Sequence, residues 1–257
     1  MGRLSNRVVF VTGASAGIGE ACARAFAREG ARLLLAARRL ERLEERRGAL
    51  RALGASDVRI LALDVRDEGA VTGAIEGLPA AWSEIEVLVG NAGLSRGLDK
   101  VQEGLVSDWD EMIDTNVKGL LYVTRAVVRG MVARGRGTVL HVGSIAGRLV
   151  YPGGAVYCAS KYAVRAITEG LRIDTLGTGV RVGEIVPGLV NTEFSTVRFH
   201  GDRERADRTY VGMTPLAAED VAEVAVFMAT RPDHVTLGEV TILPTDQAGV
   251  RDVHRRG

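Results

Sequence analysis

A short apolar run that leads through a glycine-rich turn into a helical pattern is the feature that most constrains this chain. Residues Val8–Thr12 carry the β-branched and aromatic side chains of a strand, and the turn that follows runs from Gly13 to Gly19. A helical pattern then continues through Glu29 and stops at Gly30. A strand, a glycine turn and a helix in this order predict the first unit of an α/β fold.

The same alternation continues along the chain. Further strands are expected at residues 32–37, 58–63, 87–89, 138–142, 180–186 and 239–243, and further helices at 40–53, 108–131, 157–176 and 218–230. Such alternation predicts a parallel sheet covered on both faces, a doubly wound Rossmann fold. With 257 residues, 46% of them hydrophobic, we expect one catalytic domain over residues 1–257.

One segment breaks this rhythm. Residues 191–215 place several charged side chains, among them Arg198, His200 and Arg203, on a polar background. We interpret this segment as a loop or mobile flap over a substrate.

Charge and composition exclude several classes of protein. Lys and Arg total 33 against 32 Asp and Glu, so no basic excess favours a nucleic-acid partner. No apolar run is long enough for a membrane span, and the segment from Met1 to Arg7 lacks an export signal. The two cysteines, Cys22 and Cys158, form no disulfide framework. We therefore expect a cytoplasmic protein without membrane, nucleic-acid or metal partners.

The glycine turn is a candidate phosphate site. Glycines let the backbone approach a pyrophosphate, whose charge is met by free N–H groups and the positive end of the following helix. The spacing Gly-x-x-x-Gly-x-Gly differs from Gly-x-Gly-x-x-Gly, and a simple turn is the alternative. The candidate cofactor residues here are Gly13, Ser15, Gly17, Ile18 and Gly19.

The end of the second expected strand indicates which dinucleotide binds. Sites that prefer NAD carry an acidic residue there for the ribose 2′-hydroxyl, whereas this chain has Arg38 and Arg39. Two guanidinium groups suit a 2′-phosphate, so we predict NADP(H) as the cofactor. The alternative is a solvated helix start in an arginine-rich protein.

Tyr157 and Lys161 are a candidate proton-transfer pair, four residues apart on one face of an expected helix. A neighbouring ammonium favours the phenolate of a tyrosine. The pattern also occurs as a surface pair, but the chain has three lysines against thirty arginines, so an ammonium at this position is informative. Ser144, directly after an expected strand, is placed to hold a substrate carbonyl, or else only caps a turn.

These residues resemble the short-chain dehydrogenase/reductase family over nearly the whole chain. Thr12 to Gly19 is similar to its cofactor turn, and Pro187 to Thr192 to its nicotinamide-binding segment. One departure is Gly90, where the family commonly has asparagine. The resemblance implies further cofactor contacts from Asp64, Val65, Asn91, Ala92, Gly93, Pro187, Gly188, Val190 and Thr192, and a catalytic set of Asn116, Ser144, Tyr157 and Lys161.

The resemblance also implies roles for the catalytic set. Tyr157 exchanges a proton with the carbonyl oxygen, Lys161 lowers the pKa of Tyr157 and binds the nicotinamide ribose, Ser144 positions the carbonyl, and Asn116 holds a water that links Lys161 to solvent. The family further implies a homo-oligomer, a tetramer with a dimer as the alternative, through the helices of residues 108–131 and 157–176.

Several stretches resemble the NADP-dependent 3-hydroxy acid dehydrogenases, including serine and 3-hydroxypropionate dehydrogenases. The most distinctive is Thr192 to Phe199. A small 3-hydroxy acid is therefore the expected substrate, and Arg148 or Arg198 could meet its carboxylate, unless these arginines serve a surface or interface. The alternatives are a reductase of another aldehyde or ketone, of clavulanate or 3-oxoacyl type, and a non-catalytic NADP-binding sensor.

Overall fold

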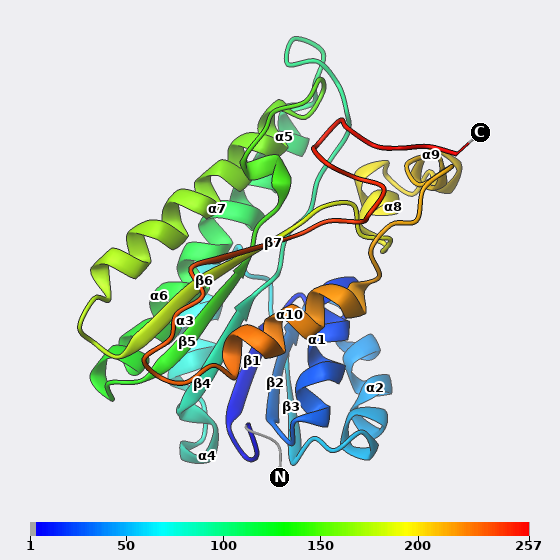
Figure 1. Cartoon of the computed structure of the whole chain (residues 1–257). Coiled ribbons are helices and arrows are strands. Elements are labelled where there is room, and N and C mark those ends of the chain that lie inside the picture. Colours follow the sequence, from blue (N-terminus) through cyan, green and yellow to red (C-terminus); the bar gives the residue numbers. More distant parts are fainter. Residues whose placement is uncertain (1–3, 257) are drawn as a thin grey trace.

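Seven parallel strands form one sheet in the computed structural model, which describes residues 4–256. The order across the sheet is β3-β2-β1-β4-β5-β6-β7, which confirms the predicted doubly wound architecture (Figure 1). The strands are β1 (Val8–Thr12), β2 (Arg32–Ala37), β3 (Asp57–Ala62), β4 (Ile85–Gly90), β5 (Gly137–Val142), β6 (Val180–Pro187) and β7 (Glu239–Ile242). Residues 1–3 and 257 of the expected domain, and with them the start of the segment examined for an export signal, lie outside the described residues.

Helices cover both faces of the sheet (Figure 1). One face carries α1 (Gly17–Arg28), α2 (Leu40–Ala52) and α10 (Ala218–Ala229), and the other carries α3 (Glu68–Glu76), α6 (Leu120–Ala133) and α7 (Ala155–Asp174). A short α4 (Ala80–Ser83) precedes β4. Among the described residues, no helix has the length and apolarity needed to cross a membrane.

Successive strand residues enter two separate cores. In β1, Val9 and Val11 join the core that contains Phe26, whereas Val8 and Phe10 join the core that contains Met131. Burying one such side chain contributes about 1.5–3 kcal/mol, and here both faces of the strand gain it. This is why the strands are nearly continuous apolar runs.

The expected single helix over residues 108–131 is interrupted. It consists of α5 (Val106–Ile113), one π-helical turn at Asp114–Gly119 and α6. A π turn inserts extra backbone into a helix and is often found at functional sites. Here it contains Asn116.

The segment 191–215 is not a plain loop, so that prediction was wrong in part. It contains α8 (Phe194–Arg198) and α9 (Arg203–Arg208). The Asp202 side chain caps α9 by accepting a hydrogen bond from the Arg205 N–H at 3.0 Å, and Ala206 packs inward. We name residues 191–215 the flap segment.

Gly90 makes room for a buried histidine. Gly90 in β4 is paired with His141 in β5, and a Cβ atom on Gly90 would lie 2.8 Å from His141 Cδ2 and 2.9 Å from Leu120 Cδ1. The His141 ring nitrogens contact the hydroxyls of Thr124 and Thr168 at 3.0 and 2.9 Å, and burial lowers its pKa to about 4. The glycine at this position therefore accommodates a neutral histidine in the core.

Replacing Gly90 by alanine is expected to lower the free energy of unfolding by about 1–3 kcal/mol, because the added methyl group overpacks the site. Urea unfolding followed by circular dichroism measures this change. Gly48→Ala on α2 is the control, since its Cβ would have no neighbour within 4 Å. Equal stability of Gly90→Ala and the wild type would contradict the steric explanation.

Candidate active site

A cavity of about 1070 Å³ opens at the carboxyl ends of the strands. The chain order reverses between β1 and β4, and ligands of open α/β sheets bind beside such a switch point. Of the predicted site residues, those that line this cavity are Gly13, Ser15, Gly17, Ile18, Arg38, Arg39, Asp64, Val65, Asn91, Ala92, Gly93, Ser144, Tyr157, Lys161, Pro187, Gly188, Val190 and Thr192. Gly19 and Asn116 do not line it.

The glycine turn is packed backbone against backbone. Gly13 and Gly17 have φ values of +65° and +54°, which favour glycine. A Cβ on Gly19 would lie 2.4 Å from the Gly13 carbonyl oxygen, so Gly19 lets α1 approach the turn and does not face the cavity. The Asn91 side chain closes the arrangement by donating to the Thr12 carbonyl oxygen at 2.9 Å.

Arginines gather at the end of β2. Arg39 donates to Ser15 Oγ at 3.3 Å and contacts the Glu193 carboxylate at 2.9 Å. Arg42, one turn further along α2, contacts the same carboxylate at 2.6 Å. Arg38 lies 3.8 Å from Glu111. Glu193 belongs to the flap segment, so a carboxylate from that segment pairs with Arg39, one of the two arginines predicted to bind a 2′-phosphate, and with Arg42, whereas Arg38 is near Glu111.

Asp64 also lines the cavity, and its carboxylate is hydrogen-bonded to Arg66. Arg66 donates to it from its side chain at 2.6 Å and from its backbone N–H at 3.0 Å. The Arg66 hydrogen bonds hold the pKa of Asp64 below its usual range, against the opposing effect of burial.

Tyr157 and Ser144 meet at the other end of the cavity. Tyr157 is 8% exposed on α7, and burial raises its pKa to about 12. The Arg198 guanidinium and a hydrogen bond with Ser144 act in the opposite direction. Ser144 Oγ also accepts a hydrogen bond from the Ala146 N–H at 3.1 Å, which orients the hydroxyl. Tyr157 therefore keeps its proton near neutral pH.

Lys161 is buried one helical turn from Tyr157. Its Nζ donates to the Val142 carbonyl oxygen at 2.9 Å, at the end of β5. Burial lowers the pKa of Lys161 to about 8, and the Glu184 carboxylate partly opposes this. In this arrangement the cation that lowers the pKa of Tyr157 is Arg198, which the sequence did not indicate.

The side chain of Asn116 makes hydrogen bonds to neighbouring parts of the fold. Its Oδ1 accepts from the Leu94 N–H at 2.8 Å, and its Nδ2 donates to the Leu94 carbonyl oxygen at 2.8 Å and to Ser160 Oγ at 3.0 Å. These bonds fix the loop after β4 to the π turn and to α7. A water held for Lys161, as the resemblance implies, would have to use the backbone of this turn.

Several cavity residues were missed from the sequence. They are Arg42, Arg96, Tyr151, Glu193, Phe194 and Gln247. Gln247 lies far along the chain from β6, yet its Oε1 accepts from the Leu189 N–H at 2.8 Å and so shapes the segment after Pro187. Sequence pattern carries no signal for such long-range contacts. Among the described residues, no group of three His, Cys, Asp or Glu side chains could hold a metal ion.

The parallel sheet, the glycine turn and the Ser144, Tyr157 and Lys161 cluster define a dinucleotide-binding oxidoreductase framework. The family model of the short chain dehydrogenases matches residues 7–202. The chain therefore belongs to the short-chain dehydrogenase family, and the resemblance seen in its sequence is confirmed.

Several proteins with known names are similar to this chain over nearly its whole length. An NADP-dependent 3-hydroxy acid dehydrogenase of Schizosaccharomyces pombe is 43% identical, over 100% of this chain and 99% of that protein. A sulfoacetaldehyde reductase of Chromohalobacter salexigens is 46% identical, over 93% of this chain and 94% of that protein. The closed form of a serine dehydrogenase complexed with NADP+ superposes with a TM-score of 0.91 at 44% identity, covering 97% of this chain and 100% of that chain.

Replacing Glu193 by glutamine is expected to tighten NADP+ binding about threefold to tenfold, because two exposed ion pairs worth about 0.2–1 kcal/mol each no longer compete with the 2′-phosphate. NAD+ lacks that phosphate, so its affinity should stay unchanged. Isothermal titration calorimetry measures both. Glu44→Gln is the matched control, since Glu44 pairs with Arg47 on the same helix as Arg42 but outside the cavity. Weaker NADP+ binding in Glu193→Gln would contradict this competition.

Proposed function

We propose that the protein is an NADP(H)-dependent oxidoreductase that reversibly transfers a hydride between nicotinamide and a small alcohol or carbonyl substrate, a 3-hydroxy acid in particular. The observation that carries this proposal is one cavity with arginines at one end and the partly buried Ser144 beside the buried Tyr157 at the other. The names of the relatives, a 3-hydroxy acid dehydrogenase and a serine dehydrogenase, support the substrate class.

The cofactor is NADP(H), and the residues present fit it. The turn at Gly13 and Gly17 leaves no side chain between the backbone and a pyrophosphate, and the N-terminus of α1 begins there. Arg39 and Arg42 stand where a 2′-phosphate needs cations. The resemblance to the family's nicotinamide-binding segment supports a cofactor role for Pro187, Gly188, Val190 and Thr192, which line the same cavity.

The chain's own residues supply the proton and the positioning. Tyr157 donates its hydroxyl proton to the carbonyl oxygen during reduction and takes it back during alcohol oxidation. Ser144 orients that oxygen, and the Lys161 ammonium favours the phenolate left on Tyr157. NADP(H), when bound, supplies or accepts the hydride. Asn116 acts indirectly, by holding the loop at Leu94 and the helix that carries Tyr157.

A reductase of another small aldehyde is the second candidate. The sulfoacetaldehyde reductase among the similar proteins favours it. Sulfoacetaldehyde also carries an anionic group, a sulfonate in place of the carboxylate of a 3-hydroxy acid. The two candidate functions therefore differ in the acid group of the substrate and share the proton transfer at Tyr157.

The chain works as one catalytic domain over residues 1–257, in the cytoplasm, and the flap segment bounds the substrate end of its cavity. Both cysteines are free and buried, which fits a reducing compartment.

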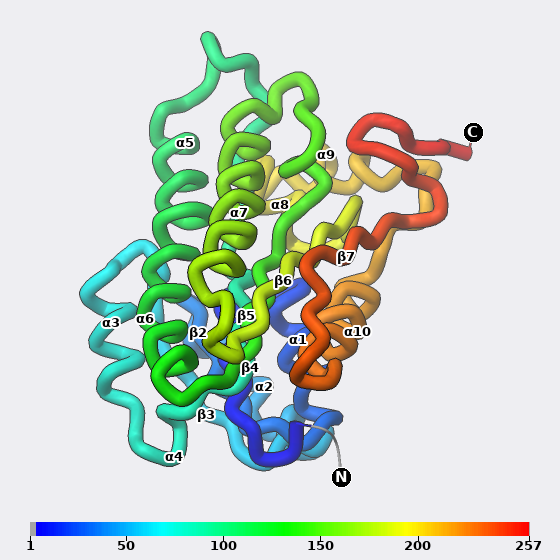
Figure 2. The backbone as a smooth tube through the Cα atoms, turned by 60° about the vertical axis from the view of Figure 1, so that its left-hand side comes forward, coloured from blue at the N-terminus to red at the C-terminus, as the bar shows by residue number. Residues whose placement is uncertain are grey.

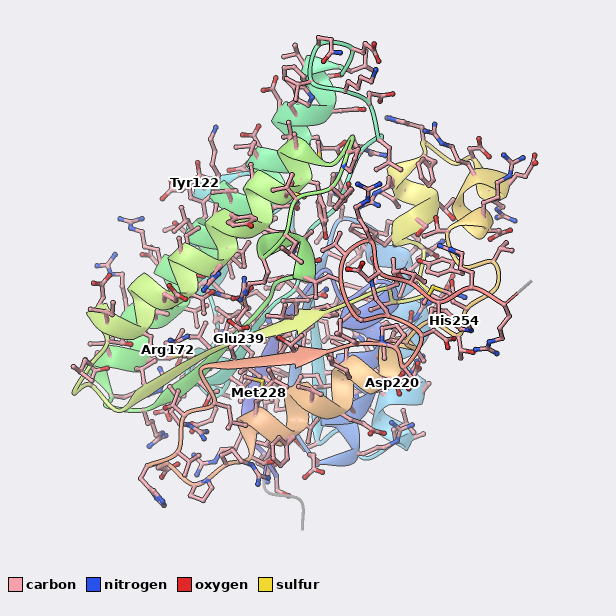
Figure 3. All side chains as sticks on the ribbon, turned by 45° about the horizontal axis from the view of Figure 1, so that its top comes forward. Tyr122, Arg172, Asp220, Met228, Glu239 and His254 are labelled. Atoms are coloured by element: carbon pink, nitrogen blue, oxygen red, sulfur yellow. The ribbon has the colours of Figure 1, made fainter. Side chains whose placement is uncertain are left out.

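Tyr157→Phe is expected to lower kcat about 100- to 10,000-fold, because the proton donor is removed, while NADP+ binding persists. The assay follows NADP+ reduction with L-serine, 3-hydroxypropionate and 3-hydroxyisobutyrate beside a neutral secondary alcohol. Tyr122→Phe is the control, a tyrosine on α6 that does not line the cavity (Figure 3). Full activity in Tyr157→Phe would reject the mechanism, and turnover of the neutral alcohol alone would reject the hydroxy-acid assignment.

A homo-oligomer, with a tetramer as the expected form, forms through α6 and α7. These helices run side by side along one side of the molecule (Figure 2), and they expose Leu121 and Ile173 by 43% and 73%. Exposed apolar side chains gathered on one surface favour association. Multi-angle light scattering should give a multiple of the 27.4 kDa chain. Leu121→Glu should lower that mass and Val211→Glu, on the flap segment, should not. A monomeric wild type would reject this assembly.

A further inference from the structure

We infer that Arg198 binds the acid group of the substrate, and so restricts the protein to small alcohols and carbonyl compounds that carry a carboxylate close to the reacting carbon. This inference rests on the proposed function and assigns one side chain to the acid end of that substrate.

Most arginines of the cavity are already paired with carboxylates. Arg38 and Arg96 contact Glu111, and Arg39 and Arg42 contact Glu193. Arg198 has no carboxylate partner within residues 4–256. Its Nε donates to Ser95 Oγ at 3.0 Å and its Nη2 donates to Tyr151 Oη at 3.1 Å. Arg198 is therefore a cavity cation with only neutral partners.

Arg198 lies against the proton-transfer residue. Its guanidinium carbon is 5.2 Å from the ring centroid of Tyr157 and 5.2 Å from that of Phe194. In a 3-hydroxy acid the carbinol and carboxylate carbons are about 2.5 Å apart, given C–C bonds of about 1.5 Å. Both side chains line the same cavity, and we propose that a molecule of this size contacts Tyr157 with its oxygen and Arg198 with its acid group.

Arg148, the other arginine that the sequence left open, is already engaged. It contacts the buried carboxylate of Glu184 at 2.7 Å and the exposed carboxylate of Glu239 on β7 at 2.6 Å, and it does not line the cavity. The structure thus decides between the two candidates in favour of Arg198.

The surroundings of Arg198 suit anion binding. The side chain is partly buried, and a buried charge without a counter-ion is costly unless an anion binds. Ser95 and Tyr151 orient the guanidinium, while the Gly97 N–H donates to the Arg198 carbonyl oxygen at 2.9 Å and fixes its backbone. A guanidinium held in one orientation suits a planar carboxylate, which it can bind with two parallel hydrogen bonds.

The test compares two substrates that share a reacting carbon, 3-hydroxypropionate and 1,3-propanediol. In Arg198→Gln, kcat/KM for 3-hydroxypropionate should fall about 10- to 100-fold further than for the diol, as expected for the loss of charge-assisted hydrogen bonds. The ratio between the two substrates is the readout, because a loss of charge near Tyr157 affects both equally. The fall should lie mainly in KM, and Arg198→Lys should restore part of it.

Arg205→Gln is the matched control. Arg205 lies on the same flap segment and also stacks on an aromatic ring, that of Phe199 at 4.5 Å, but it does not line the cavity. Its substrate ratio should equal that of the wild type. Arg203 lines the outer cavity, and a ratio that changes in Arg203→Gln but not in Arg198→Gln would overturn the inference.

The wild type provides a second measurement that needs no variant. Propionate should compete with 3-hydroxypropionate, and 1-propanol at equal concentration should not. If Arg198→Gln does not fold, this competition and the Arg198→Lys ratio decide. A wild type without activity on any hydroxy acid would reject the proposed function itself. A wild type active on hydroxy acids, with an unchanged ratio in Arg198→Gln, would overturn only the role of Arg198.

Discussion

The close approach of β1, α1 and β4 around the glycine turn is the constraint on which the cavity depends. The Cβ that Gly19 lacks would lie 2.6 Å from Asn91 Nδ2 as well as against the Gly13 carbonyl. Asn91 in turn needs that space to reach the Thr12 carbonyl oxygen. These contacts fix the turn against the ends of β1 and β4 at the point where the sheet order reverses, and they place the start of α1 on the cavity wall.

The ends of the cavity differ in how their charges are balanced. At the β2 end, Arg39 and Arg42 are neutralised by Glu193, an exposed residue that can move away at small cost. At the Tyr157 end, Lys161 is desolvated and Arg198 has neutral partners, so positive charge is concentrated there. Glu193 is the N-cap of α8 and Arg198 is the last residue of that helix. A change at the arginines can thus reach the substrate end through one helical turn.

The sequence predicted what depends on local pattern and missed what depends on distant contacts. Strands such as Val8–Thr12 and Arg32–Ala37 were predicted with their observed ends, because burial on both faces leaves a continuous apolar run and glycines mark the turns. Ser144, Tyr157 and Lys161 were selected as candidates from their type, their spacing and the scarcity of lysine, and all three line the cavity. The pairing of Arg42 with Glu193 and the fit of His141 beside Gly90 join distant segments, so no periodicity reports them. The short α8 and α9 also escaped, since helices of one or two turns are stabilised by packing rather than propensity.

The position of Arg198 links substrate charge to the proton on Tyr157. Burial alone raises the pKa of Tyr157, and the Arg198 charge acts against it. In our proposal an acid group bound to Arg198 cancels part of that charge, which raises the pKa of Tyr157 further. A higher pKa makes the phenol a weaker acid, so proton donation needs a second cation that stabilises the phenolate. We propose that the buried Lys161 ammonium, one helical turn away, is that cation in both directions of the reaction.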